Sequence, residues 1–202
     1  MAAKSKGQTT RAHILKTTRH LFTTQGFSNT SVNTIIAATG VKKGNLYYHF
    51  ASKEELGLAV LLDAQEEFTG FLNDSFQGEN PVDKIIHSCE MLLEFLQKQN
   101  FVGGCLFGNT ALEMTDGNSK FGKIIQDVFD HWTAKIEQHL TEGQVDGSFV
   151  SSIPIPALAT TVVATIEGGI MMSRVSKGKK GLADCVVTLR AILKGSQVSR
   201  TL

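Results

Sequence analysis

Residues Gly40 to Phe50 have the sequence "GVKKGNLYYHF". It sets three apolar residues, Val41, Leu46 and Phe50, among two lysines, an asparagine, two tyrosines and a histidine. On a short helix the apolar residues would hold one face against a core and leave the polar ones exposed. Lysines neutralise phosphates, tyrosine hydroxyls donate to phosphate oxygens, and asparagine can bind a base edge. We therefore predict that this stretch is a helix that enters a DNA groove.

The residues before this stretch predict two further helices. Thr9 to Gln25 has apolar residues at helical spacing, and Gly26 follows as a stop. Residues 28–40, "SNTSVNTIIAATG", offer Ser and Thr caps and a stop at Gly40. The apolar face of that second helix would comprise Val32, Ile35, Ile36, Ala38 and Thr39. A short helix, a turn with Gly and another short helix form the helix-turn-helix pattern, whose second helix lies in the major groove.

The charges divide the chain at the same place. The first 53 residues hold eight Lys or Arg and no Asp or Glu, and the rest holds twelve basic and nineteen acidic residues. This division is typical of a polyanion-binding head joined to a separate body. A solvated basic tail would give the same charges, but such a tail would lack the apolar period. We predict a helix-turn-helix DNA-binding domain over 1–53 and a helical body over 54–202.

Composition indicates an ordinary globular protein, with 202 residues that are 42% hydrophobic and 19% charged. No run in the sequence approaches the roughly 18 apolar residues of a membrane span, and the first residues lack the apolar segment of a secretory signal. We therefore expect a cytoplasmic location and no membrane contact. The three cysteines are widely spaced and form no CxxC pair, so we expect reduced thiols rather than disulfides or zinc.

The same region is similar to a known family. Residues 30–56, "TSVNTIIAATGVKKGNLYYHFASKEEL", preceded by "ILKTTRHLFTTQGF", closely resemble the N-terminal domain of the TetR family of bacterial transcriptional regulators. The shared elements are the LF...GF end of the first helix, the TSV opening, the G-V-x-K-G-x-L-Y-x-H-F run and S-K-E-x-L. The departures are small: Thr18 and Ile36 stand where Ala is common, and Lys42 where Ser is frequent. The resemblance covers only the head.

The resemblance implies a DNA-binding role for Thr30, Ser31, Lys42, Lys43, Gly44, Asn45, Tyr47, Tyr48, His49 and Lys53. The first two would contact phosphate at the start of the second helix, and residues 43–45 would face bases or the adjacent backbone. Tyr47, Tyr48 and His49 would bind phosphates, and Lys53 would bind another at the start of the fourth helix. Two assignments stay open, because Lys42 could be merely solvated and His49 could brace its helix instead.

The body is predicted to be helical throughout. Apolar stripes indicate helices over Leu56–Phe76, over a segment that Asn80 and Pro81 open, and over Ser119–Thr141 with a stop at Gly143. Cys89 lies on the second of these stripes, so we expect it to pack in the core. The fold class is therefore all-α, with a three-helix DNA-binding domain and a larger helical domain for effector binding and dimerisation.

The C-terminal third predicts assembly. Pro156–Ser176 is apolar or small over most of its circumference, which requires a partner that covers it. Two helices from each of two chains would pack as a four-helix interface, as the resemblance implies, and a two-fold dimer would present two heads to a palindromic operator. A fully internal helix in a monomer is the alternative.

The stretch "FVGGCLFGNTALEM", residues 101–114, is the most unusual part of the body. Gly103 and Gly104 would break the preceding helix, and Cys105 would stand at the N-terminus of the next, where the helix dipole lowers a thiol pKa. Cys105 is therefore either a redox or electrophile sensor or a small packed thiol beside a ligand pocket. Residues that could line such a pocket are Cys105, Asn109, Glu113, His131, Trp132 and Met171.

An enzyme is not expected. Catalytic and nucleotide-binding fingerprints are missing from the sequence, and the six histidines do not pair with carboxylates at ligand spacing. We therefore expect no catalytic residue, no metal site and no cofactor. An all-helical thiol enzyme acting through Cys105 stays a remote alternative, and nonspecific nucleic-acid coating is a third. The sequence favours a homodimeric repressor that an unknown small-molecule or thiol-reactive effector releases from its operator.

Overall fold

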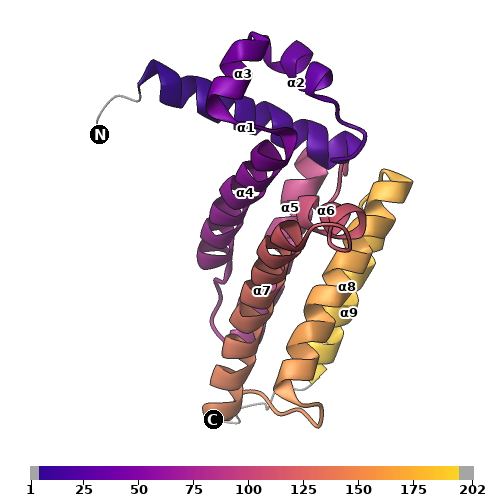
Figure 1. Ribbon diagram of the computed structural model, residues 1–202. Helices are drawn as coiled ribbons and strands as arrows, with labels where there is room; N and C mark the ends of the chain where they lie inside the picture. The colour runs from indigo at the N-terminus through magenta and orange to yellow at the C-terminus, as the bar shows by residue number, and fades with distance from the viewer. Residues whose placement is uncertain (1–4, 196–202) are drawn as a thin grey trace. The chain divides into compact units, whose positions relative to one another are not determined.

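The computed structural model describes residues 5–195, and the regular structure over that range is α-helical, as the sequence predicts (Figure 1). The helices are α1 Lys6–Gln25, α2 Val32–Thr39, α3 Lys43–His49, α4 Lys53–Ser75, α5 Pro81–Lys98, α6 Leu106–Met114, α7 Ser119–Val145, α8 Ile155–Ser176 and α9 Lys180–Gly195. The all-α prediction is confirmed.

The helices form two compact units. The first unit comprises Met1–Glu67 and Cys105–Gln126, and the second comprises Phe68–Gly104 and Asp127–Leu202. The first unit thus holds the whole predicted DNA-binding segment, the first part of α4, all of α6 and the first residues of α7. The predicted boundary between a DNA-binding domain over 1–53 and a helical domain over 54–202 stays a prediction.

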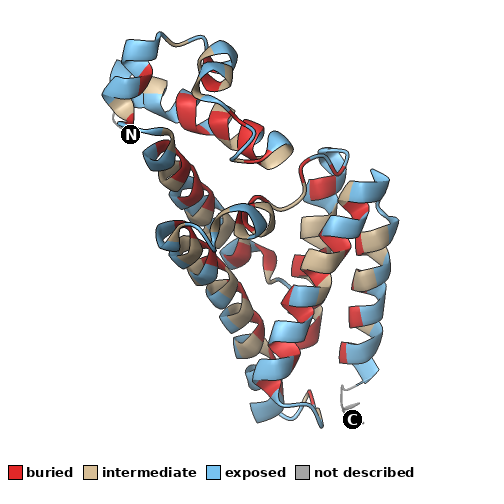
Figure 2. Cartoon of the chain, turned by 45° about the vertical axis from the view of Figure 1, so that its right-hand side comes forward, coloured by how far each residue is buried: buried red, intermediate tan, exposed pale blue. Residues whose placement is uncertain are grey.

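Helix α1 begins earlier than the sequence pattern indicated. Ser5 and Gln8 form a capping box, in which the Ser5 hydroxyl accepts from the Gln8 N–H and the Gln8 side chain accepts from the Ser5 N–H. These bonds satisfy N–H groups that the first turn leaves without helical partners. The helix ends where predicted, at Gly26, whose φ of +87° suits glycine. Its buried face consists of Ile14, Leu15, Thr18, Leu21 and Phe22 (Figure 2).

Helices α2 and α3 form the predicted helix-turn-helix, and α2 packs on α1. Ser31 caps α2, and Gly40 ends it in the left-handed conformation. Only part of the predicted apolar face is buried, because Ile35 and Thr39 lie in the core whereas Ala38 is exposed. A small helix of two turns can turn only a narrow stripe inward, and Ala38 lies outside it.

The second unit has α5, α8 and α9 as its frame, with α9 packed on both of the others. Asn80 caps α5 and Pro81 occupies its first turn, as predicted. The helix ends slightly before the end of the predicted stretch, which runs to Asn100. It stops at Lys98, before Gly103, because Asn100 turns left-handed and the Asn100 and Phe101 N–H groups bond back to Gln97 and Leu96. Similarly, α7 runs past the predicted stop at Gly143 to Val145.

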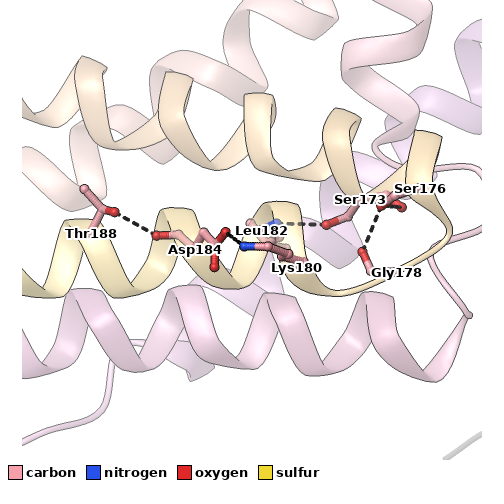
Figure 3. Close-up of polar contacts among 7 residues, drawn as sticks. All are labelled: Ser173, Ser176, Gly178, Lys180, Leu182, Asp184 and Thr188. Carbon is pink, nitrogen blue, oxygen red and sulfur yellow. Dashed lines mark hydrogen bonds and ion pairs between the residues drawn. The ribbon is translucent and has the colours of Figure 1, made fainter.

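The turn between α8 and α9 is tightly bonded (Figure 3). The Leu182 N–H donates to the buried Ser173 hydroxyl over 2.8 Å, and Lys180 pairs with Asp184 in the first turn of α9. Gly169 lets the two helices approach, since a Cβ there would lie 3.0 Å from the Leu182 Cα. Among the described helices, α8 alone is long and apolar enough to cross a membrane by length and composition. Nine of its residues are buried within the protein, which is equally typical of a core helix.

Candidate nucleic-acid interface

Helix α3 presents its polar residues outward. Leu46 and Phe50 are each only 3% exposed, so they hold the helix on the core as predicted. On the other side Tyr48 is 82% exposed and Tyr47 43% exposed. Residues 42–45, which are Lys42, Lys43, Gly44 and Asn45, are all exposed as well. The arrangement gives a surface of two cations, one amide and two phenols with no carboxylate on the helix.

A hollow of about 510 Å³ opens beside the start of α3. Its walls come from α1, from the α2–α3 turn and from α3, and they consist of Thr9, Thr10, His13, Gly40, Val41, Lys42 and Asn45. The His13 Nε2 lies 3.0 Å from the Thr39 carbonyl oxygen and so ties α1 to the end of α2. The sequence prediction missed the three α1 residues, because they precede the family motif and only the fold brings them beside Asn45.

The two residues at the start of α2 differ in exposure. Ser31 is exposed, and its hydroxyl accepts from the Thr34 N–H over 3.0 Å. Thr30 is completely buried, and its hydroxyl donates to the Gly26 carbonyl over 2.7 Å. Thr30 therefore has neither surface nor a free hydroxyl for a phosphate, and the prediction of a phosphate contact for it is corrected: this side chain braces the turn before α2.

Lys53 lies at the start of α4 and is half-buried. Its Nζ lies 4.3 Å from the centre of the Phe27 ring and 3.5 Å from the Ser28 carbonyl oxygen. Burial lowers the pKa of Lys53, and the negative charge of Glu113 opposes that shift. The ammonium group is thus held beside the α1–α2 turn, close to the start of α2. His49 is also half-buried, with its ring edge-on to Tyr48 at 5.1 Å, so both of its predicted roles remain open.

The residues predicted to line an effector pocket do not all lie in one unit. Cys105, Asn109 and Glu113 belong to the first unit, and His131, Trp132 and Met171 belong to the second. Cys105 does cap α6, as predicted, and its Sγ accepts from the Gly108 N–H over 3.4 Å. Asn109 donates to the Thr23 carbonyl and Glu113 accepts from the Ser28 N–H, so both bind the end of α1 and the turn after it.

In the second unit the three candidates differ from one another. Trp132 is buried and packs edge-on against Phe68 at 5.4 Å, as a core residue does. Met171 is 59% exposed on α8. The Nε2 atom of His131 is buried and has no hydrogen-bond partner among the described residues. The effector pocket itself stays a prediction.

Comparisons with known proteins match both parts of the chain. A family model described as bacterial regulatory proteins, tetR family, matches residues 14–60. A second model, described as the C-terminal domain of tetracyclin repressor-like proteins, matches residues 81–188, more than half of the chain. The first match includes α2, α3 and the start of α4, and the second runs from α5 into α9.

Individual relatives span nearly the whole chain. The HTH-type transcriptional regulator UidR of Escherichia coli K12 is 33% identical over 197 residues, which cover 95% of each chain. The HTH-type transcriptional repressor DhaR of Mycobacterium sp. GP1 is 27% identical over 192 residues, which cover 93% of this chain and 94% of DhaR. A crystal structure of a TetR transcriptional regulator from Chloroflexus aurantiacus is 31% identical, with a TM-score of 0.85 over 92% of this chain and 94% of that one.

Proposed function

Because this chain belongs to the TetR family of bacterial transcriptional regulators, we propose that it is a repressor that binds a palindromic operator as a homodimer and leaves it when an effector binds. The relative DhaR is named a repressor, which supports this direction of control. The chain would act in the cytoplasm, where an operator is accessible. We expect no catalytic activity.

The observation that carries the proposal is the exposed face of α3. The lysine and tyrosine side chains on this face are exposed, while Leu46 and Phe50 are buried and hold the helix against the core. Lys43 and Tyr47 would bind phosphates or the adjacent backbone, and Asn45 would bind a base edge. Ser31 and Lys53 would add phosphate contacts on either side, and the hollow beside Asn45 would admit the DNA backbone next to α1.

The dimer is supported by apolar side chains that the chain leaves exposed on its last two helices. The exposed residues are Met171, Met172 and Val175 of α8 and Val187 and Ile192 of α9. Burying such side chains against a partner is favourable by about 25 cal/mol per Å² of apolar surface. A two-fold partner would present the same face, and the two copies would then offer two α3 helices to the two halves of a palindrome.

Release would be a shift of populations. An effector can dislodge the protein only if it binds more tightly to a conformation whose two α3 helices do not match successive major grooves. The Nε2 of His131 is buried and has no hydrogen-bond partner within residues 5–195, which supports a ligand in the second unit, since a buried polar atom gains from a hydrogen bond.

Substitutions on α3 test the proposal. We expect Lys43→Ala combined with Tyr47→Phe to weaken binding to a palindromic duplex from upstream of its own gene by at least about tenfold, because two phosphate contacts are lost. Lys98→Ala in the second unit removes an exposed charge far along the chain and serves as the control. Fluorescence anisotropy titrations measure both. Equal affinities for the two variants would contradict a DNA-binding role for α3.

The thiol sensor is the second candidate, and the position of Cys105 favours it. The Sγ atom receives an N–H at the start of α6, where the helix dipole stabilises a thiolate. If it is the sensor, a mild oxidant releases the wild-type protein from DNA but does not release a Cys105→Ser variant. If both stay bound, Cys105 is not an oxidant sensor, and a reversible ligand is the remaining candidate.

A further inference from the structure

Glu113 lies outside the motif that resembles the DNA-binding family, yet its carboxylate contacts the turn that leads into α2. Its Oε2 accepts from the Ser28 N–H over 3.0 Å. Gly26 begins that turn with a φ of +87°, and a Cβ there would lie 2.5 Å from the Glu113 Oε1. The carboxylate therefore packs against the Gly26 backbone, and a side chain at position 26 would displace the carboxylate.

Glu113 also acts on Lys53. The Lys53 ammonium lies over the Phe27 ring and 3.5 Å from the Ser28 carbonyl oxygen, on the same turn that Glu113 binds. The negative charge of Glu113 favours the charged form of Lys53 and offsets part of the cost of its burial. One carboxylate thus binds the backbone of the turn, and its charge favours the cation that lies on the same turn.

Neighbouring contacts support this arrangement. Asn109, one helical turn before Glu113, donates its side-chain N–H to the Thr23 carbonyl over 3.3 Å, at the end of α1. The Phe121 ring packs edge-on against Phe27 at 5.2 Å and is only 1% exposed. Residues of α6 and α7 thus fix the end of α1 and the following turn from within the first unit.

The position of this turn bears on two of the proposed phosphate contacts. Ser31, three residues after Ser28, caps α2 and is exposed at its start. Lys53 begins α4. These two residues are the proposed phosphate contacts on either side of α3, and their separation depends on where the turn lies.

We propose that Glu113 is a positioning residue for DNA binding: its carboxylate fixes the turn of residues 26–28 and the adjacent Lys53, so that the starts of α2 and α4 can bind the DNA backbone together. The inference rests on the proposed function. The inference requires that an acidic side chain strengthens binding to a polyanion.

The sign of that effect gives a sharp test. Removing a carboxylate makes the protein more positive, and general electrostatics then predicts tighter DNA binding. We expect the opposite for Glu113→Ala, a loss of about tenfold in operator affinity, since a charge-assisted hydrogen bond and the placement of Lys53 are both lost. Asp116→Ala is the matched control, because it removes an exposed carboxylate from the same unit. We expect equal or slightly tighter binding for that control.

Three further tests separate positioning from a general loss of stability. The plot of log affinity against log salt should become shallower by about one unit for Glu113→Ala, because one phosphate contact is lost. In a Lys53→Ala background, Glu113→Ala should cost clearly less than tenfold, since the two act on one contact. Glu113→Gln keeps an acceptor for the Ser28 N–H, so it should fold like the wild type and bind with intermediate affinity.

The inference is overturned if Glu113→Ala and Glu113→Gln bind the operator as tightly as Asp116→Ala does. It is also overturned if the losses from Glu113→Ala and Lys53→Ala simply multiply and the salt slope is unchanged. Failure of the proposed function looks different: the wild-type protein itself would then show no preference for the operator.

Discussion

Asn45 and Lys43 lie two residues apart on α3, and both are exposed, but we expect them to affect DNA binding in different ways. An amide can bind one base edge with two hydrogen bonds, which discriminates among bases by about 1–3 kcal/mol. A lysine that binds phosphate contributes equally to every sequence. Asn45→Ala should therefore lower the ratio of operator to random-duplex affinity, whereas Lys43→Ala should lower both affinities together. Titration of each variant with both duplexes measures the ratio, and equal losses on both duplexes for Asn45→Ala would remove it from the base-binding residues.

Cys89 gives a prediction on pH. Burial, with a smaller contribution from the Glu90 charge, raises the pKa of this thiol to about 12. In the unfolded chain the thiol ionises near pH 8.5. Since the folded state holds the proton more tightly, the stability that Cys89 contributes is complete below about pH 8.5 and is lost as the pH rises towards 12.

We therefore expect the wild type to lose roughly 1–2 kcal/mol more unfolding free energy between pH 7.5 and pH 10 than a Cys89→Ala variant loses. Other groups titrate in both proteins and cancel in the comparison. Urea unfolding at the two pH values gives the numbers. Equal losses in the two proteins would show that Cys89 ionises freely in the folded state.

For single residues, the sequence predicted which side chains are buried better than it predicted which ones are available to contact DNA. Leu46 and Phe50 were placed correctly because apolar spacing on a helix directly determines which side faces the core. The prediction for Thr30 was wrong, because nothing in the sequence distinguishes a buried Thr30 from the exposed Ser31 beside it. Its burial depends on the Gly26 carbonyl, which the turn brings within 2.7 Å. The contact between Glu113 and Ser28 could not be predicted either, since it joins residues 85 positions apart; the pocket assignment of Glu113 stays a prediction.

At the scale of elements, the paired glycines of α8 give the clearest prediction. A Cβ on Gly169 would lie 3.0 Å from the Leu182 Cα and 3.1 Å from the Cys185 Sγ, whereas one on Gly168 would meet nothing within 4 Å. Gly168→Ala should therefore stabilise the fold by up to about 1 kcal/mol through helix propensity. Gly169→Ala should destabilise it by about 1–2 kcal/mol, because α9 must move. Thermal unfolding of both variants measures the difference, and equal stabilisation by both would contradict the close approach of α8 and α9.

Helix existence was predictable and helix ends were less so. The apolar period of each helix is local, and Asn80, Gly26 and Gly40 cap or stop their helices as the sequence indicated. The errors arise where a helix begins or ends at a residue that the sequence pattern does not mark. Asn100 adopts a left-handed conformation before Gly103 is reached, and the Ser5 cap precedes the first apolar residue by several positions.

At the scale of the whole molecule, the proposed assembly can be tested directly. Val175→Glu combined with Val187→Glu puts charge on the exposed apolar face of α8 and α9, so we expect a dimer in the wild type and a monomer in this variant. Leu112→Glu is the control, because Leu112 is 89% exposed but lies on α6 in the first unit. Sedimentation at micromolar concentration distinguishes the outcomes. A monomeric wild type would contradict the proposed dimer. A double variant that still dimerises would show that the interface lies elsewhere.

The division of the chain into compact units could not be read from the sequence. The charge boundary at residue 53 separates a basic segment from an acidic one, but the compact first unit also includes α6 and the start of α7. Those residues join it through contacts such as Asn109 with Thr23 and Phe121 with Phe27, which no local pattern indicates. Charge therefore indicated a candidate DNA-binding segment, but it did not indicate which residues fold together.

We propose that the exposed face of α3 gives sequence-specific, salt-dependent binding to duplex DNA. The most direct test titrates the full-length protein onto two fluorescent duplexes of equal length and composition, one carrying the palindrome from upstream of its own gene and the other a shuffled sequence, over a series of salt concentrations. We predict affinity for the palindrome at least about 10³-fold higher and a linear fall of log affinity with log salt. Equal affinity for both duplexes would contradict the account, and would leave a protein that coats nucleic acid without reading it.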